Sequence, residues 1–428
     1  MIKSPLHDSK AFLLAIHTPD IPERTVAESL QELASLCQSV GGVVVGEMVQ
    51  TRPRFHPGTL FGSGKLDEIK AALTAHQADM VLLDHNLSPS QGDNLERILG
   101  VLVLDRTQLI LEIFGQNART HEARLQVELA QLLYMLPRLV GLWAHLDRER
   151  GGISGSKGTG EKQINIDRTL IRNRIAQLRK ELRHLAQERK TQKKRRANCF
   201  RVSLVGYTNA GKSTLMNRLT DAGVKVENRL FATLDATTRA MERTNRPHVL
   251  LTDTVGFINR LPHELVASFR STLEVLGEAD LLLQVVDVAD SGYPEQIATT
   301  IRVLEDIGAQ NVPRLLVFNK VDRVEDRVDL LLARKAYPDA LFISAVRDDV
   351  APLRARVLEF FERSMLTTPL QLAYADYPEL SKIYRWGRVD EVTYTEDGIH
   401  LVVTATPANL ERIRAKTRVW QPTATGPA

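Results

Sequence analysis

The fold is decided by the stretch Gly206-Tyr207-Thr208-Asn209-Ala210-Gly211-Lys212-Ser213, which fits the phosphate-binding pattern G-x-x-x-x-G-K-[ST] at every position. The apolar run Val202–Val205 before it predicts a buried strand, and residues 212–221 after it have helical character. In that setting the glycines let successive backbone N–H groups converge on phosphates at a helix N-terminus. We expect Lys212 to neutralise β- and γ-phosphate oxygens and the Ser213 hydroxyl to ligate Mg²⁺.

The composition indicates a globular protein with several domains. At 428 residues, 43% hydrophobic and 25% charged, the chain has room for about two to four ordinary domains. It contains no apolar run of about 18 residues, and residues 1–8 lack the apolar core of a signal peptide. Cys37 and Cys199 are the two cysteines and lack metal-ligand spacing. We expect a cytoplasmic protein without an integral membrane segment, and peripheral membrane association stays open.

Residues 1–118 are expected to form an N-terminal α/β domain. Short apolar runs that predict buried strands alternate with longer stretches that predict helices. The strands are expected at residues 11–16, 43–49, 80–84 and 101–105, and the helices at residues 25–40, 65–75 and 89–99. This alternation is typical of a mainly parallel sheet with helices on its faces.

Residues 119–198 carry two apolar stripes at helical spacing on either side of a glycine-rich stretch. The first stripe is Leu125, Leu129, Leu132 and Leu136, and the second is Ile171, Ile175, Leu178, Leu182 and Leu185. Between them, a flexible polar loop is expected around Gly151, Gly152, Gly155, Gly158 and Gly160, with Lys157 and Lys162 on it. The pattern predicts an antiparallel coiled-coil hairpin.

The second helix of this hairpin is strongly basic. Its basic residues are Arg168, Arg172, Arg174, Arg179, Lys180, Arg183, Arg189, Lys190, Lys193, Lys194, Arg195 and Arg196. Most charge runs are solvated faces, but this excess has one sign and lies beside a projecting loop. Few aromatic residues are interleaved, so contacts to a structured RNA backbone are favoured over stacking on unpaired bases.

Residues 199–364 are expected to form the nucleotide domain and residues 365–428 a small α+β tail domain. Further strands are expected at residues 249–253, 281–287, 314–318 and 341–344. In the tail, residues 389–395 and 398–403 predict a hairpin, since Glu396-Asp397-Gly398 is a favourable turn, and residues 407–416 predict a helix.

Three short motifs follow expected strands of the nucleotide domain, where ligands bind in open α/β sheets. They are Asp253-Thr254-Val255-Gly256, Asn319-Lys320-Val321-Asp322 and Ser344-Ala345. Asp253 is expected to hold Mg²⁺ through water, and the Gly256 amide to sense the γ-phosphate. The Asp322 carboxylate can accept two hydrogen bonds from the N1–H and N2–H₂ edge of guanine, a donor pair that adenine lacks.

The motifs therefore predict GTP over ATP. The side-chain stem of Lys320 is expected to pack over the base, and Asn319 to tie this loop to the phosphate loop. A backbone amide at Ser344-Ala345 can bind guanine O6.

A first switch is expected within Phe231-Ala232-Thr233-Leu234-Asp235-Ala236-Thr237-Thr238. One threonine must close over Mg²⁺ and the γ-phosphate. We favour Thr233 for this role, with Thr237 as the alternative, because spacing alone does not decide between them. Phe257 follows the Asp-x-x-Gly motif, where many GTPases have a glutamine that orients the attacking water. We therefore expect slow intrinsic hydrolysis and stimulation by a partner.

From about Ala11 to Arg363 the chain resembles the HflX family of translation-associated GTPases. The stretches that carry the resemblance are Gly62-Ser63-Gly64-Lys65, Leu87-Ser88-Pro89-Ser90-Gln91, Asp105-Arg106-Thr107, Arg119-Thr120-His121-Glu122, Leu125–Leu132 and Phe231–Asp235. The resemblance supports Thr233 as the switch threonine, and a hydrophobic residue at Phe257 is the family habit. Lys157–Glu161 departs from the family's usual Arg-Gly-Pro-Gly-Glu.

The resemblance implies a GTPase of α/β class, in which a P-loop GTPase domain is joined to the N-terminal domain, the hairpin and the tail. It implies binding to the large ribosomal subunit and its rRNA, with stimulation by that subunit and splitting or rescue of stalled ribosomes. It also implies that the hairpin reaches toward the ribosomal active centre. Lys212, Thr233 and Gly256 would then act on the γ-phosphate, with Mg²⁺ held by Ser213, Thr233 and Asp253.

Two other functions are compatible with parts of the sequence. A GTP-gated RNA-binding factor in large-subunit assembly is the alternative. A coiled-coil scaffold with a degenerate nucleotide domain is disfavoured because Lys212, Ser213, Asp253 and Asp322 are all present. We expect a monomer, with GTP and GDP as substrate and product and no DNA partner.

Overall fold

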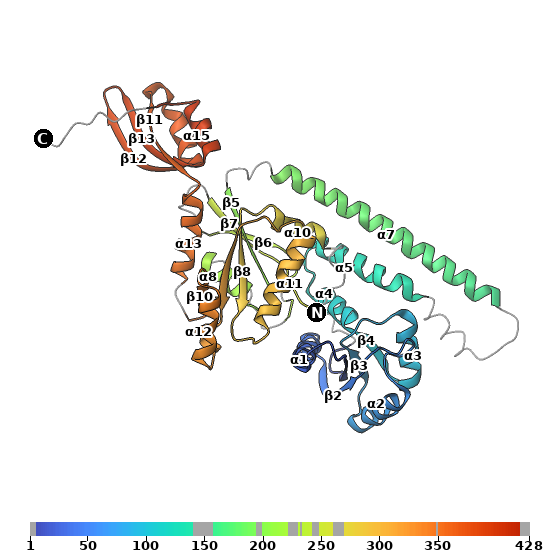
Figure 1. Ribbon diagram of the computed structural model, residues 1–428. Coiled ribbons are helices and arrows are strands. Elements are labelled where there is room, and N and C mark those ends of the chain that lie inside the picture. Colours follow the sequence, from blue (N-terminus) through green and yellow to red (C-terminus); the bar gives the residue numbers. More distant parts are fainter. Residues whose placement is uncertain are drawn as a thin grey trace. The chain divides into compact units, whose positions relative to one another are not determined.

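The computed structural model describes residues 6–139, 157–193, 199–220, 230–231, 233–241, 248–259, 269–347 and 350–419 (Figure 1). Contacts divide the chain into two compact units. Unit 1 takes residues 1–187, 227–235 and 255–272, and unit 2 takes residues 188–226, 236–254 and 273–428. The expected nucleotide domain, residues 199–364, therefore contributes two stretches to unit 1.

Unit 1 is built on a four-stranded sheet in the order β2-β1-β3-β4, and all its pairings are parallel. The strands are β1 (Lys10–His17), β2 (Val43–Thr51), β3 (Met80–Leu83) and β4 (Leu102–Asp105). The connecting helices are α1 (Glu23–Ser39), α2 (Ser63–His76) and α3 (Pro89–Leu99), and α4 (Arg106–Asn117) follows β4. The predicted parallel α/β arrangement is confirmed.

Local side chains fix the helix starts and close one edge of this sheet. Ser88 and Asp105 cap α3 and α4, each with a glutamine three residues later that completes a capping box. On the edge strand β4, the Val103 N–H donates to Glu96 at 3.1 Å and the Asp105 N–H donates to Gln108 at 3.1 Å. These two N–H groups therefore have partners within the domain, so they are not available to pair with an added strand.

The predicted helical hairpin is confirmed as a pair of packed helices, α5 (His121–Met135) and α7 (Lys157–Lys193), which lie side by side in Figure 1. Leu125 and Leu129 pack with Ile175 and Leu178 in one apolar cluster. A bidentate ion pair between Arg174 and Glu128 joins the two helices beside the cluster, with 2.7 and 2.9 Å between the bonded atoms.

The expected loop at the hairpin tip is shorter than predicted. Because α7 already begins at Lys157, the positions Lys157, Gly158, Gly160 and Lys162 are helical. Gly151, Gly152 and Gly155 lie outside the described residues. No helix in the described part of the chain is long and apolar enough to cross a membrane.

Unit 2 contains a six-stranded sheet in the order β10-β9-β8-β5-β7-β6. Its strands are β5 (Cys199–Gly206), β6 (Thr237–Ala240), β7 (His248–Asp253), β8 (Leu281–Asp287), β9 (Arg314–Asn319) and β10 (Leu341–Phe342). Its helices are α8 (Lys212–Thr220), α10 (Arg270–Gly277, which begins in unit 1), α11 (Tyr293–Asp306), α12 (Arg327–Ala336) and α13 (Ala351–Glu362). All strands are parallel except β6, an antiparallel edge strand that the sequence did not reveal.

The tail is a small antiparallel sheet in the order β12-β13-β11-β14, with two helices. Its elements are β11 (Leu366–Leu372), α14 (Leu380–Trp386), β12 (Arg388–Thr395), β13 (Gly398–Ala405), α15 (Pro407–Arg414) and β14 (Arg418–Val419), with the short 3₁₀ helix η4 (Tyr374–Glu379). Thr395 pairs with Gly398, so the predicted hairpin is confirmed, and α15 is the predicted helix. Strand β11 was not predicted.

The seam of the hairpin can be tested with two leucines of α7. Leu178 has 0% exposure and packs in the seam, whereas Leu170 is 60% exposed. We expect Leu178→Ala to lower the free energy of unfolding by about 2–5 kcal/mol, because it leaves a cavity, and Leu170→Ala to change it by less than about 0.5 kcal/mol. Urea unfolding followed by circular dichroism measures both. Equal effects of the two changes would contradict the packed seam.

Candidate functional site

The turn from β5 into α8 has a backbone that requires its glycines. Gly206 has a φ of +142° and Gly211 a φ of +95°, both outside the range that most side chains adopt. A Cβ at Gly206 would collide with the Val285 carbonyl oxygen, and a Cβ at Gly211 would collide with the Asn319 amide. The loop therefore packs tightly against the adjoining strands β8 and β9.

Lys212, the first residue of α8, is buried inside this loop. Its Nζ donates to the carbonyl oxygens of Gly206 at 3.1 Å and Tyr207 at 2.8 Å. Burial lowers the pKa of Lys212 to about 8; Asp253 opposes this shift and Lys320 adds to it. A buried ammonium group held only by neutral carbonyls and one carboxylate is well suited to an added anion.

Next to the lysine, two oxygen-bearing side chains meet. The Ser213 hydroxyl donates to the Asp253 carboxylate at 2.6 Å, and the Thr254 hydroxyl donates to the Leu204 carbonyl at 2.7 Å, which fixes the end of β7. Hydroxyl and carboxylate oxygens beside a phosphate loop suit Mg²⁺. Among the described residues, no group of three or more His, Cys, Asp or Glu could hold a metal.

Asn319, at the end of β9, joins three loops. Its side-chain amide donates to the Ala210 carbonyl in the phosphate loop at 2.9 Å, and its carbonyl accepts the Ala345 N–H at 2.9 Å. Lys320 follows with a φ of +62°, and its ammonium group donates to Asp287 at 2.6 Å. The phosphate loop and the loops after β9 and β10 are thus held together by Asn319.

Asp322 is a partly buried carboxylate beside these loops. A hydrogen bond with the Ser344 side chain is the main reason that its pKa lies below the ordinary value, and Arg347 contributes, with 3.7 Å between its Nε and the carboxylate. Ser344 and Ala345 are both buried. The carboxylate is therefore ionised at neutral pH and ready to accept N–H donors.

Sequence reasoning missed Asp287 and Arg347, which contact Lys320 and Asp322. Asp287 could have been found from the sequence, because it lies at the end of an expected strand, as Asp253 does. No sequence pattern indicates Arg347. It lies on a turn, and only the folded structure brings it to Asp322.

The expected first switch is divided between the units: its residues up to Asp235 belong to unit 1, whereas Thr237, the alternative threonine, begins β6 in unit 2. Phe231 is buried in unit 1, with its ring edge-on to Phe114 at 4.7 Å between ring centroids, and Phe114 also contacts Phe269 at 5.1 Å. The Phe231 carbonyl accepts a hydrogen bond from Asn117 at 2.9 Å. The expected first switch is therefore anchored on α4.

A second contact ties the same segment to the start of α5. Asp235 accepts the backbone N–H groups of Arg119 and Thr120 at 3.3 and 3.2 Å, and the Thr120 hydroxyl also donates to it. Thr120 is the N-cap of α5, where its hydroxyl accepts the Ala123 N–H at 3.1 Å. The carboxylate thus lies at a helix N-terminus, where negative charge is stabilised.

The remaining predicted residues are distributed as follows. Leu234, Val255, Gly256 and Phe257 are buried, Thr233 is partly buried, and all five lie in unit 1; Ala232 lies outside the described residues. Unit 2 brings together the residues Gly206–Ser213, Asp253, Thr254, Asn319–Asp322, Ser344 and Ala345.

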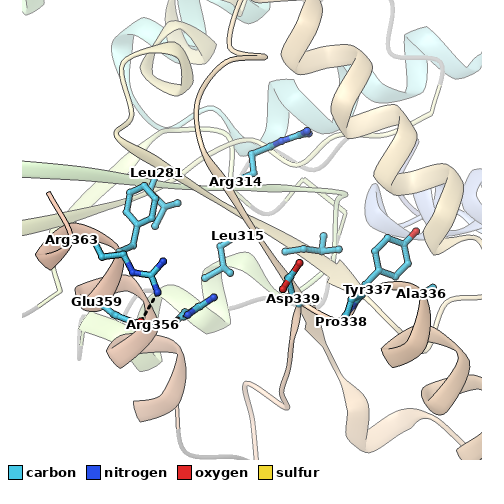
Figure 2. A pocket seen from close by; sticks show the side chains of 13 residues that line it. Leu281, Arg314, Leu315, Ala336, Tyr337, Pro338, Asp339, Arg356, Glu359 and Arg363 are labelled. Carbon is cyan, nitrogen blue, oxygen red and sulfur yellow. Dashed lines mark hydrogen bonds and ion pairs between the residues drawn. The ribbon is translucent and has the colours of Figure 1, made fainter.

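A separate cavity of about 400 Å³ lies at the opposite, amino end of the unit 2 strands (Figure 2). Leu281 and Arg314, which begin β8 and β9, line it. Two of its arginines, Arg356 and Arg363, donate to Glu359 at 3.1 and 2.6 Å, so their charge is partly neutralised. It shares no lining residue with the loops described above.

Comparison with known proteins gives matches along most of the chain. Residues 27–115 match the family model described as GTP-binding GTPase N-terminal, residues 117–196 the GTP-binding GTPase Middle Region, and residues 201–320 the 50S ribosome-binding GTPase. The GTPase HflX of Gluconacetobacter diazotrophicus is 42% identical, with 94% of this chain and 97% of that protein covered. The GTPase HflX of Escherichia coli is 44% identical over 87% and 88%.

These matches confirm the resemblance and the fold class expected from the sequence. The GTPase HflX of Magnetococcus marinus, 40% identical over 97% of both chains, extends the similarity through the tail. The family and its GTPase domain show that GTP is the nucleotide that is bound and hydrolysed. The chain belongs to the HflX family of GTPases.

Proposed function

We propose that this GTPase is a nucleotide-controlled switch that binds the large ribosomal subunit in the cytoplasm and splits or rescues stalled ribosomes. The observation that carries the proposal is the contact between Asp235, in the first switch, and the N-terminus of α5, a helix of the basic hairpin. Through these hydrogen bonds the segment that would respond to the nucleotide contacts the element that would bind RNA.

At the phosphate end of the site, positive charges would neutralise the phosphate oxygens. Lys212 leaves its two carbonyl partners and neutralises β- and γ-phosphate oxygens, while the loop amides contact the same phosphates. Ser213 and, through water, Asp253 would hold Mg²⁺, which supplies charge neutralisation to the phosphates. Gly256 would donate its amide to the γ-phosphate, and Thr233 would complete the ion's ligands.

The base end would read guanine with the ionised Asp322 carboxylate. Lys320 covers the base with its aliphatic stem while Asp287 holds its ammonium group. Arg347 lies at the same carboxylate and orients it. The tie through Asn319 fixes the distance between base and phosphates.

The coupling step follows from the position of Thr233, two residues before Asp235. If GTP draws Thr233 toward the γ-phosphate, the chain would pull on the Asp235 carboxylate, which is bonded to the N-cap residue Thr120. Hydrogen bonds to a charged group contribute about 1.5–3 kcal/mol each, which is within the range of a typical allosteric coupling energy. Loss or gain of these bonds would change how the start of α5 is held.

The hairpin presents its charge to the outside. On α7 the side chains of Arg172, Arg179, Lys180 and Arg183 are exposed, whereas the apolar stripe is packed against α5. Exposed cations on one rigid helix can bind the phosphate backbone of structured rRNA.

Phe257 cannot orient water, so we propose that hydrolysis is slow until the large subunit supplies the missing order. The assembly factor remains the second candidate, since the basic hairpin serves either role.

The pKa of Lys212 predicts proton uptake on nucleotide binding. In the free protein the pKa is about 8, and phosphates would raise it toward the ordinary 10.5 by favouring the charged form. At pH 8 we therefore expect uptake of about half a proton per GDP bound. Calorimetry in two buffers with different heats of ionisation measures it.

The sign of this linkage is fixed by the direction of the shift. Between pH 8 and 10.5 the unfolded chain binds the extra proton, so the nucleotide-free fold gains stability as pH rises through that window. Proton release at pH 8, or none exchanged, would contradict the phosphate role of Lys212.

The base-reading role predicts a change of nucleotide preference. Asp322→Asn replaces two acceptors by an acceptor and a donor, so GTP affinity should fall about 100-fold or more. Xanthosine triphosphate, which has an oxygen at C2, should gain affinity for the variant. Fluorescence competition against both nucleotides measures this. An unchanged ratio would refute the role of Asp322.

The ribosomal role is tested by sedimentation of intact ribosomes with the protein and GTP. We expect dissociation into subunits, with the protein on the large subunit. Binding to free large subunits without dissociation would favour the assembly role, and no co-sedimentation with either would contradict both.

The route through α5 is tested in the same assay by Asp235→Ala. We expect this variant to bind GTP but to bind large subunits equally with GTP and GDP. The control is Asp326→Ala, which also removes a carboxylate that accepts a backbone N–H at a helix start, that of Val328 in α12 at 2.8 Å, and it should behave like the unmodified protein.

A further inference from the structure

The two edges of the unit 1 sheet differ in how their backbone groups are used. On the edge strand β4, the N–H groups of Val103 and Asp105 donate to side chains of the same domain. The opposite edge strand is β2, which pairs with β1 alone (Figure 1). It is the longest strand of this sheet, and it contains no lysine or proline. Natural proteins usually protect a long edge strand by such residues or by a covering element.

The hydrogen-bond pattern shows which backbone groups of β2 point away from the sheet. The N–H of Arg52, directly after the strand, donates to the His17 carbonyl of β1 at 2.8 Å. Backbone groups alternate in direction along a strand, so every second residue before Arg52 also faces β1 as far as the register is regular. The residues between them are Glu47, Val49 and Thr51, and their N–H and C=O groups therefore point outward.

These outward groups are accessible. Glu47 and Thr51 are exposed, and Val49 is 39% exposed. Within the part of the chain that the structure describes, no hydrogen bond reaches the backbone N–H or C=O groups of these three residues from outside the strand pair. This edge of β2 is thus a row of unpaired donors and acceptors, which is a template for another strand.

Two interruptions limit the stretch of β2 that can pair. The register between β1 and β2 shifts after Ala11, so Val45 is an extra residue that forms a β-bulge on β2. On the other side, Pro53 has no N–H group to donate. Val45 and Pro53 lie equally far along the chain from Val49. The open stretch is therefore symmetric about Val49.

This symmetry favours a second copy of the same chain as the partner. When two β2 strands run antiparallel with their Val49 residues opposite each other, Glu47 lies opposite the partner's Thr51. Val45 then lies opposite the partner's Pro53, so the two interruptions coincide at both ends of the ladder. No like charges face each other across the paired stretch, which would otherwise destabilise it.

We propose that β2 pairs with β2 of a second copy, with the two-fold axis at Val49, so that the two four-stranded sheets become one continuous sheet. Glu47, Val49 and Thr51 each exchange N–H···O=C hydrogen bonds with the opposite residue of the partner strand. This dimer differs from the monomer expected from the sequence, because an open strand edge is visible only in the folded sheet. One short strand buries a small area, so the dimer is weak and depends on protein concentration.

The test follows the molecular mass of the full chain by analytical ultracentrifugation over a range of concentrations. We expect the unmodified chain to dimerise. Val49→Lys should dimerise at least about tenfold more weakly, because two ammonium groups would face each other at the axis. The matched control is Leu102→Lys, since Leu102 is 45% exposed on the protected edge strand β4, and it should dimerise like the unmodified chain.

The register is tested by single cysteine variants oxidised with diamide. Opposite Cα atoms of a hydrogen-bonded antiparallel pair are about 5.5 Å apart, which a disulfide can bridge. Val49→Cys should therefore form a cross-linked dimer, whereas Thr51→Cys alone should not. A mixture of Thr51→Cys and Glu47→Cys should cross-link. The unmodified chain, with Cys37 and Cys199, gives the background.

A chain that stays monomeric up to about 100 µM would overturn the proposal. A dimer that is as stable in Val49→Lys, or cross-linking of Thr51→Cys to itself, would overturn it too. Slow amide exchange at Val49 in dilute, monomeric protein would show that another part of this chain covers β2. Binding of an extended valine- and threonine-rich peptide by a chain that does not self-associate would identify a foreign strand as the occupant; either result contradicts the dimer. The measurements contain no ribosome, so they are independent of the proposed ribosomal role.

Discussion

The carboxylate of Asp235 accepts two backbone N–H groups and one hydroxyl at the start of α5, and this contact determines how the parts of the chain can act on one another. Its donors, Arg119 and Thr120, lie directly before His121, the first residue of α5. The switch segment therefore belongs to unit 1, although its neighbours in sequence on the C-terminal side form β6 in unit 2. Only Ala236 separates Asp235 from β6, so the two segments are directly linked along the chain.

The nucleotide loops of unit 2 and the switch segment of unit 1 differ in how firmly they are held. In unit 2 the glycine turns, the Asn319 hydrogen bonds and the Ser213–Asp253 pair fix the phosphate loop against the neighbouring strand ends. In unit 1 the aromatic contact between Phe231 and Phe114 and the hydrogen bonds to Asp235 hold the switch by interactions worth only a few kcal/mol. A nucleotide-controlled protein needs such a combination of a firmly held binding site and a switch segment that can change its contacts.

Local pattern was sufficient to predict the fold wherever a strand, turn and helix follow one another directly. The parallel sheets, the stripe at Leu125 and Leu129, and the turn before Gly398 were all legible in this way. Strand β6 was missed because four residues on an edge carry no periodic signal, and β11 because Pro369 interrupts its pattern.

The candidate site was predictable in its loops but not in its partners. Each motif residue follows a strand end, which the sequence reveals, whereas Arg347 meets Asp322 only after the chain has folded. The assignment of Phe231 and Asp235 to unit 1 was equally hidden, since their partners Phe114 and Thr120 lie more than a hundred residues away. Such long-range contacts depend on packing rather than on local propensity.

The central claim is that the terminal phosphate of GTP changes the hold of the switch on α5. Backbone hydrogen exchange at residues 119–126, compared between the GDP form and a form with a non-hydrolysable GTP analogue, measures this most directly. The N-terminus of α12, capped by Asp326, serves as the internal reference. We expect a clear difference in exchange between the two forms at residues 119–126 and none at α12. Identical exchange at residues 119–126 in both forms, with the nucleotide site saturated, would contradict it.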